Sequence, residues 1–162
     1  MKMTYPIFCV RLITEKEMTS LAVKFAACLD EGMIIFLYGS LGAGKTTFVR
    51  GVLSGFGYVG KVKSPTYTLV ESYELNGQTI HHFDFYRVKD ASELSSMGIS
   101  EYFTPNAMAL IEWPEKGFPL LPTPDLSCYI AMINQEREFR IEAQTERGKN
   151  ALVILLGAMD RQ

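Results

Sequence analysis

The sequence has few residues that could build a disulfide framework or a metal centre. Its 162 residues include three widely separated cysteines, Cys9, Cys28 and Cys128, with no C-x-x-C pair. This spacing argues against a zinc site and favours reduced thiols of a cytoplasmic protein. The only histidines, His81 and His82, would face opposite sides of a strand. We therefore expect both to serve packing rather than a shared metal site.

The sequence also lacks long apolar runs and a strong charge of either sign. No stretch reaches the roughly 18 apolar residues of a membrane-spanning helix, and the N-terminus lacks a signal-peptide pattern. The net charge of −2 argues against tight, non-specific binding of nucleic acid through charge alone. The length suits a single domain covering residues 1–162, which we expect to be cytoplasmic.

What the sequence does contain is a glycine-rich loop between an apolar run and a helical pattern. GSLGAGKT, residues 39–46, fits the pattern G-x-x-x-x-G-K-[ST] at every position. Backbone N–H groups of such a loop converge on phosphate, the lysine neutralises the β and γ phosphates, and the threonine hydroxyl binds Mg²⁺. The motif fits ATP and GTP equally, and hydrolysis as well as transfer. We predict that a nucleoside triphosphate is bound by Gly39, Gly42, Ala43, Gly44, Lys45, Thr46 and Thr47.

Apolar periodicity around this loop predicts an α/β domain. Strands are expected at residues 8–13, 33–38, 67–75, 79–86, 107–111, 126–133 and 138–143. Helices are expected from a capping box at Thr14 to Gly32, at 45–56, from Asp90, and near Leu152. Asn76-Gly77 predicts a hairpin between the third and fourth strands. The expected fold is a P-loop NTPase-like three-layer domain with a mixed, mostly parallel central sheet and an added β-hairpin.

Two carboxylates are candidates for work beside the phosphates. Glu112 ends the buried strand in AMALIEW, where a P-loop enzyme places the acidic residue near its metal. Asp84 in HHFDFYR would share a strand face with His82 and Tyr86, and it could bind Mg²⁺ through water or position the attacking water. The alternatives are a solvated carboxylate at Glu112 and an ion pair of Asp84 with Arg87. The candidate catalytic set is Lys45, Asp84 and Glu112.

Three further residues are candidates for a switch or a partner contact. Ser64 and Thr66 flank Pro65 in VKSPTYTLVE, where a hydroxyl could reach the γ-phosphate or Mg²⁺. A simple turn into a strand is an equally good interpretation of this segment. Trp113, the sole tryptophan, either packs in the core or presents a rigid aromatic ring to a partner.

The motifs KSPTYTLVESY, HFDFYR, ELSSMGISEYF and LIEWPEKG, in this order after the glycine loop, resemble the TsaE (formerly YjeE) family. These are small bacterial ATPases required for threonylcarbamoyl-adenosine (t6A) modification of tRNA. The resemblance covers residues 12–120. It implies ATP with Mg²⁺, Thr46 and Glu112 as metal ligands, Asp84 as necessary for hydrolysis, and a functional role for Trp113. It also implies that Glu15 lies near the base, although the capping box explains the same residue.

The resemblance implies TsaD and TsaB as partners, and tRNA only indirectly through their complex. TsaD would transfer the threonylcarbamoyl group to adenosine 37 of tRNAs reading ANN codons, and ATP hydrolysis by this chain would reset the TsaD–TsaB assembly. One departure from the family pattern is Ser40, which stands where an acidic residue is common. We expect nucleotide binding to tolerate it. Direct tRNA contact by Lys61, Lys63, Arg87 and Lys89 stays open, beside their interpretation as solvated side chains.

Two other functions compete with a hydrolase. A nucleotide-gated assembly module would need ATP to be bound but not hydrolysed. A small P-loop kinase would need a lid with several arginines to clamp the transferring phosphoryl group. The stretch after Glu112 has Lys116 but no arginine before Arg137, which argues against the kinase.

Overall fold

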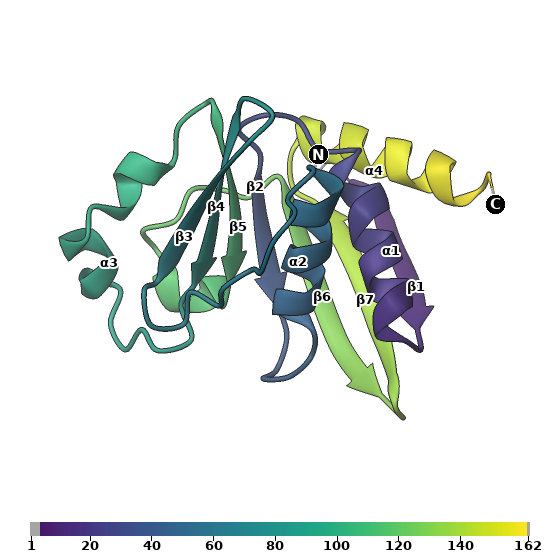
Figure 1. The fold of residues 1–162 in the computed structure, drawn as a ribbon, viewed down its shortest axis with the longest axis horizontal. Helices are drawn as coiled ribbons and strands as arrows, with labels where there is room; N and C mark the ends of the chain where they lie inside the picture. The colour runs from purple at the N-terminus through teal and green to yellow at the C-terminus, as the bar shows by residue number, and fades with distance from the viewer. Residues whose placement is uncertain (1–3, 162) are drawn as a thin grey trace.

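The computed structural model describes residues 4–161, which alternate between strands and helices (Figure 1). The elements are β1 (Ile7–Leu12), α1 (Glu15–Ala26), β2 (Ile34–Tyr38), α2 (Lys45–Gly55), β3 (Val70–Leu75), β4 (Gln78–Asp84), α3 (Ser92–Ser96), η1 (Ile99–Tyr102), β5 (Ala107–Glu112), η2 (Pro114–Gly117), β6 (Leu126–Ile133), β7 (Glu136–Ala143) and α4 (Glu146–Met159). Within the described range, no helix combines the length and apolar character needed to cross a membrane.

The strands form one mixed sheet in the order β1-β7-β6-β2-β5-β4-β3. The four central strands β6, β2, β5 and β4 run parallel, whereas β1, β7 and β3 pair antiparallel to their neighbours. The β3–β4 hairpin turns at Asn76-Gly77, where both residues have positive φ. The predicted P-loop NTPase-like α/β fold, with a parallel centre and an added hairpin, is confirmed. Because parallel strands share one carboxyl edge, β2, β4 and β5 all end at the same edge of the sheet.

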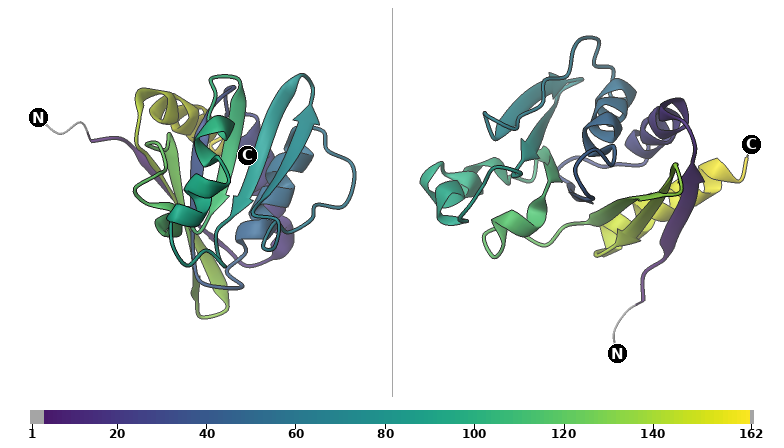
Figure 2. Two further views of the ribbon diagram at one scale, coloured as in Figure 1. Left: turned by 90° about the vertical axis from the view of Figure 1, so that its left-hand side faces the viewer. Right: turned by 90° about the horizontal axis from the view of Figure 1, so that it is seen from below.

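Helices cover the two faces of the sheet unequally (Figures 1 and 2). The larger hydrophobic cluster joins α1, α2 and α4, including Phe48 of α2, to inward side chains of the strands, including Leu110 and Phe139. The smaller cluster lies under α3 and η1, where Phe83 and Phe85 are fully buried with Leu94 and Ile99. Even-numbered side chains of β4 and β5 therefore face α2. Among them, Asp84 and Glu112 are on the face from which a side chain can reach the glycine loop.

Helices α1 and α2 pack unusually closely. A Cβ added to Gly51 would lie 2.5 Å from Cβ of Ala22, and one added to Gly55 would lie 2.6 Å from Cβ of Ala26. Glycine in a helix interior costs about 1 kcal/mol relative to alanine. These two glycines therefore lower the intrinsic stability of α2 but allow its backbone to approach α1 closely. The result is that α2, which begins at the glycine loop, is seated directly against α1.

The first helix begins as predicted but ends earlier. Thr14 and Glu17 form the capping box, with Oγ1 of Thr14 accepting from the backbone N–H of Glu17 at 3.1 Å and Oε2 of Glu17 accepting from the N–H of Thr14 at 2.8 Å. The helix ends at Ala26 rather than at Gly32. Gly32 instead forms a turn with φ of 74°, where a Cβ would come within 2.1 Å of a backbone oxygen of Pro105.

The predicted hairpin strands were too long at their outer ends. The third strand begins at Val70 rather than at 67, because residues 65–68 form a turn in which the N–H of Leu69 donates to the carbonyl of Pro65 at 2.7 Å. The fourth strand ends at Asp84 rather than at Tyr86. Both corrections lie at the carboxyl edge, where the chain leaves the sheet to build the site.

Candidate nucleotide-binding site

A cavity of about 330 Å³ opens at the carboxyl edge of the parallel strands. Its walls come from segments far apart in the sequence, namely Leu41, Gly42, Gly44, Lys45, Thr46, Thr47 and Arg50 of the loop and α2, Ser64 and Thr66, Asp84 and Tyr86, Glu112, and Arg137. The predicted loop, carboxylate and hydroxyl residues thus meet in one place. Gly39 and Ala43 shape the loop behind this wall.

The glycine loop has the backbone geometry of a phosphate cradle. Gly42 and Gly44 have φ of 79° and 114°, which side-chain-bearing residues rarely adopt. Gly44 is the N-cap of α2, so the positive end of that helix opens into the cavity. The side chain of Ser40 is exposed, and it is the Ser40 carbonyl that bonds to Lys45, so the missing acidic side chain leaves the loop geometry intact.

Lys45 lies folded back over its own loop. Its Nζ donates to the carbonyls of Gly39 at 2.7 Å and Ser40 at 2.8 Å, and it lies 4.5 Å from the centroid of the Trp113 ring. Lys45 is buried, with only 4% of its surface exposed. Burial lowers the pKa of Lys45, and the negative charge of Glu112 opposes that shift. An anion in the cavity would supply the counter-charge that this lysine otherwise draws from loop carbonyls.

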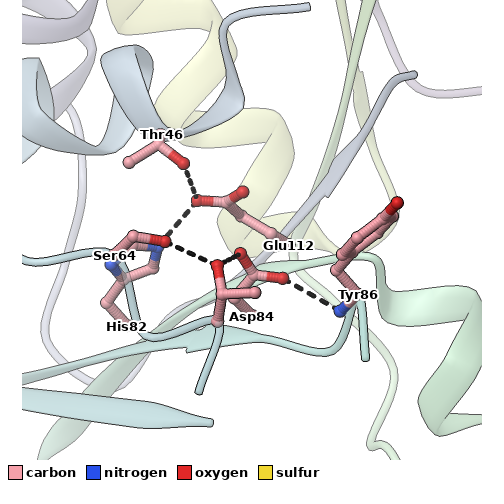
Figure 3. Close-up of polar contacts among 7 residues, drawn as sticks. Thr46, Ser64, His82, Asp84, Tyr86 and Glu112 are labelled. Carbon is pink, nitrogen blue, oxygen red and sulfur yellow. Dashed lines mark hydrogen bonds and ion pairs between the residues drawn. The ribbon is translucent and has the colours of Figure 1, made fainter. Parts of the chain in front are cut away.

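Glu112 joins the glycine loop to strand β4 (Figure 3). Its Oε1 accepts from Oγ1 of Thr46 at 2.9 Å and lies 2.8 Å from Nε2 of His82. Glu112 and His82 are 2% and 0% exposed, so the alternative of a solvated carboxylate is wrong. Our expectation that His82 serves packing alone missed this contact. The strand alternation did place His82 on the face of Asp84, but the pairing of β4 with β5 was needed to bring it to Glu112.

Asp84 organises the segment around Ser64 and Thr66. Its Oδ2 accepts from Oγ1 of Thr66 at 3.1 Å, and Thr66 in turn bonds to the Ser64 hydroxyl at 2.7 Å. Its Oδ1 accepts from the N–H of Tyr86 at 2.9 Å. Burial, and then the charge of Glu112, raise the pKa of Asp84. The two hydroxyl residues are therefore part of the site and not only a turn.

The alternative partner of Asp84, Arg87, points elsewhere. Its Nη2 donates to the hydroxyl of Tyr67 at 2.9 Å, and its guanidinium lies 4.2 Å from the centroid of the Tyr67 ring. Among the ion pairs of residues 4–161, none joins Asp84 to an arginine or a lysine. The interpretation of Asp84 as half of a structural ion pair is therefore wrong.

Trp113 bridges the loop lysine and the molecular surface. Its backbone has φ of 57°, in the left-handed region, and the half-buried ring lies 5.2 Å from that of Tyr86 and 5.5 Å from Nζ of Lys116. The ring packs against the smaller hydrophobic cluster, so packing against the core is confirmed, and it also borders the rim of the site. It touches Lys45 on one side and residues of the outer rim on the other.

Arg137 is a site residue that sequence reasoning missed. It lies on β7, and its Nε donates to the carbonyl of Ala43 at 2.9 Å. In the sequence it stands out only as the first arginine after Glu112, but the β6–β7 hairpin returns it to the loop, 94 residues after Ala43. Among the described ion pairs it has no carboxylate partner. Glu15 starts α1 and is not among the residues that line the cavity, so its contact with the base stays a prediction.

The oxygen atoms in the cavity fit a hard divalent cation. The Thr46 hydroxyl and the Glu112 and Asp84 carboxylates provide ligands of the type that Mg²⁺ prefers. No group of three or more His, Cys, Asp or Glu side chains in the described part of the chain could hold a metal ion by itself. At phosphate-binding loops in general, Mg²⁺ is held through one or two protein groups, water and the phosphates of the nucleotide.

Comparisons with known proteins agree with this geometry. A family model described as "Threonylcarbamoyl adenosine biosynthesis protein TsaE" matches residues 12–143. The TsaE protein of Haemophilus influenzae is 46% identical over 143 residues, covering 85% of this chain and 90% of that protein. The TsaE protein of Bacillus subtilis is 35% identical over 138 residues, covering 85% and 86%.

A solved structure gives the same result for the fold. The crystal structure of YdiB from Bacillus subtilis superposes with a TM-score of 0.84 at 27% identity, covering 98% of this chain and 99% of that one. The matched region contains the glycine loop, both buried carboxylates and Arg137. The chain therefore belongs to the TsaE family of threonylcarbamoyl adenosine biosynthesis proteins.

Proposed function

We propose that this chain binds ATP with Mg²⁺ and hydrolyses the ATP in support of threonylcarbamoylation of adenosine 37 in tRNAs reading ANN codons. The observation that carries the proposal is the 2.9 Å bond from the Thr46 hydroxyl to Glu112 at the start of α2. It joins the last residue of the phosphate-loop motif to a buried carboxylate at a strand end, and together they form half of a Mg²⁺-nucleotide site.

The loop and its neighbours would bind the triphosphate. Backbone N–H groups of the loop and the N-terminus of α2 attract the phosphates. Lys45 would leave the carbonyls of Gly39 and Ser40 to contact the β and γ phosphates, and Arg137, anchored through Nε, would offer its remaining N–H donors to the nucleotide. Thr46 and Glu112 would hold a Mg²⁺ ion, which would supply neutralisation of the phosphate charge.

The surroundings of the two carboxylates suit them to different roles. Glu112 is already bonded to Thr46 and His82, which suits a metal ligand that must stay in place. Asp84 accepts from the Thr66 hydroxyl, which bonds to Ser64, and burial raises the pKa of Asp84, which makes it a better proton acceptor. We assign to Asp84 the orientation of the water that attacks the γ-phosphorus, with the water proton passing toward its carboxylate.

The hydrolysis would act on a complex of TsaD and TsaB, which performs the transfer to tRNA, so that this chain contacts tRNA only through its partners. The membership of the TsaE family supports this placement. We place the reaction in the cytoplasm, where Cys9, Cys28 and Cys128 would remain the free thiols seen in the structure.

A reconstituted reaction with TsaD, TsaB, tRNA and a threonylcarbamoyl donor tests the proposal. With ATP, the wild-type chain is expected to support many rounds of tRNA modification, whereas Thr46→Ala and Asp84→Ala are expected to stop after about one round. Glu115→Gln, an exposed carboxylate beside the site, is the matched control. If a non-hydrolysable ATP analogue sustains repeated rounds, hydrolysis is dispensable and the chain is the nucleotide-gated assembly module.

A further inference from the structure

His82 is a buried polar side chain with one hydrogen-bond partner. It lies on β4 and is 0% exposed, and its Nε2 lies 2.8 Å from Oε1 of Glu112. The other ring nitrogen, Nδ1, is buried and has no hydrogen-bond partner among the described residues. Its cross-strand neighbours are Leu110 of β5 and Glu71 of β3, and the strand position before it on the same face is Ile80.

Packing alone does not account for a histidine at this position. A buried polar atom without a partner costs free energy that an apolar side chain of similar size would avoid. Two neighbours of His82 on this face, Ile80 and Leu110, belong to the larger hydrophobic cluster, so a leucine would pack against them without leaving a buried nitrogen unpartnered. The single interaction that distinguishes histidine from leucine here is the bond to Glu112.

The direction of that bond follows from the chemistry of the partner. A carboxylate that binds a metal ion is ionised and only accepts hydrogen bonds, so in this role Nε2 of His82 would donate to Oε1. The same oxygen accepts from Oγ1 of Thr46 (Figure 3). Two donors from two different elements, α2 and β4, fix the orientation of the carboxylate. No hydrogen bond of the described residues involves Oε2 of Glu112, so this oxygen is left available.

We propose that His82 is a positioning residue that holds the Glu112 carboxylate against Thr46, so that the pair binds the metal ion of the nucleotide. This inference rests on the proposed function, because it concerns the metal ligand assigned there. Groups that orient a metal-binding carboxylate commonly change metal affinity by about 10–100-fold when removed. His82 is fully buried and does not line the cavity, so its effect would run through Glu112.

Three variants separate this role from packing. His82→Gln keeps an N–H donor at a reach close to that of Nε2, and His82→Leu removes the donor while keeping apolar bulk. The matched control is His81→Leu, because His81 faces the other side of β4, where its Nδ1 bonds to Ser72 at 2.7 Å. Binding of Mn²⁺ to each variant with a non-hydrolysable ATP analogue is measured by electron paramagnetic resonance. Affinity for the same analogue in EDTA and the melting temperature are measured in parallel.

His82→Leu is expected to weaken Mn²⁺ binding by about 10–100-fold while changing nucleotide affinity in EDTA by less than about threefold. His82→Gln is expected to recover most of the loss, and His81→Leu to bind Mn²⁺ as the wild type does. If His82→Leu does not fold, His82→Asn, whose amide is too short to reach Glu112, replaces it in the comparison with His82→Gln.

Two negative outcomes are distinguishable. If His82→Leu or His82→Asn binds Mn²⁺ as tightly as the wild type, while Glu112→Gln does not, the inference about His82 is overturned and the proposed function stands. If the wild-type chain itself binds neither the analogue nor Mn²⁺ in its presence, the proposed function fails, and the inference fails with it.

Discussion

Nζ of Lys45 lies 4.5 Å from the centre of the Trp113 ring, so the lysine of the phosphate loop contacts the sole tryptophan of the chain. The same ring borders Tyr86 and Lys116 on the outer rim of the site. A lysine that moves onto phosphate oxygens leaves the face of this ring. We therefore expect occupancy of the site by a triphosphate to change the surroundings of Trp113.

Tryptophan emission is expected to report nucleotide binding. Adding the Mg²⁺ complex of a non-hydrolysable ATP analogue should change the Trp113 emission in a saturable manner, because Lys45 leaves the ring. Lys45→Met should weaken binding by at least about tenfold, since it removes the charge that meets the β and γ phosphates. The emission titration gives the affinity. An unchanged emission, at concentrations where equilibrium dialysis shows the site to be full, would contradict the coupling.

Glu112→Gln is expected to lower the rate of ATP hydrolysis by about 10²-fold or more, because the amide has no charge to offer the metal. Affinity for ATP in EDTA should change little, since the loop backbone and Lys45 remain. Phosphate release and dialysis measure the two quantities. Glu115→Gln is the control, as its exposed side chain lies three residues away. A hydrolysis rate equal to that of the wild type would remove Glu112 from the mechanism.

Asp84→Asn is expected to stabilise the nucleotide-free protein at neutral pH. Burial raises the pKa of Asp84 in the folded state, so the folded chain holds this proton more tightly than the unfolded chain. Stability therefore falls as the pH rises from the ordinary pKa of 3.8 through the raised value. Melting temperatures in EDTA should favour the variant at neutral pH, and the difference should vanish below the ordinary pKa.

Asp90→Asn provides a control of opposite sign for this prediction. Hydrogen bonds from Ser92 lower the pKa of Asp90, so its contribution to stability is present above the ordinary value and is lost as the pH falls. The Asn variant should therefore be no more stable than the wild type at neutral pH. A lower melting temperature for Asp84→Asn at neutral pH would show that its bonds to Thr66 and Tyr86 outweigh the cost of burying the charge.

Arg137→Gln is expected to weaken nucleotide binding by about tenfold, equivalent to about 1.4 kcal/mol. The change removes the hydrogen bond from Nε to the Ala43 carbonyl. It also removes a positive charge from the cavity wall that would attract the phosphates. Arg140→Gln is the matched control on the same strand, because Arg140 lies over the ring of Tyr129 instead, 4.5 Å from its centroid. Equal affinities for Arg137→Gln and Arg140→Gln would exclude Arg137 from the binding site.

Much of the site could be predicted because its chemistry is encoded in short segments. The loop at Gly39–Thr46 has a spacing that only a phosphate cradle requires, and Glu112 follows a run of residues that a buried parallel strand requires. The order of strand, loop and helix around this motif is likewise determined by neighbouring residues. These features depend on neighbouring residues, so periodicity and motif spacing were sufficient to find them.

The misplaced features depend on contacts between distant segments. His82 acquires its role through the pairing of β4 with β5, and Arg137 acquires its own through the β6–β7 hairpin. Neither pairing is visible in local periodicity. The ends of the hairpin strands were wrong for a related reason, since the turn at Pro65 and the bond from Thr66 to Asp84 draw residues 65–69 away from the sheet.

The absence of side chains at Gly51 and Gly55 has a mechanical consequence. With the backbone of α2 almost touching Ala22 and Ala26, that helix cannot slide or rotate on α1 without steric overlap. We therefore expect the half of the site formed by the glycine loop and α2 to stay fixed when a nucleotide binds. Any movement that follows hydrolysis is then expected in the opposite half, in the segments around Thr66 and Trp113. A partner that senses the nucleotide is expected to contact that half.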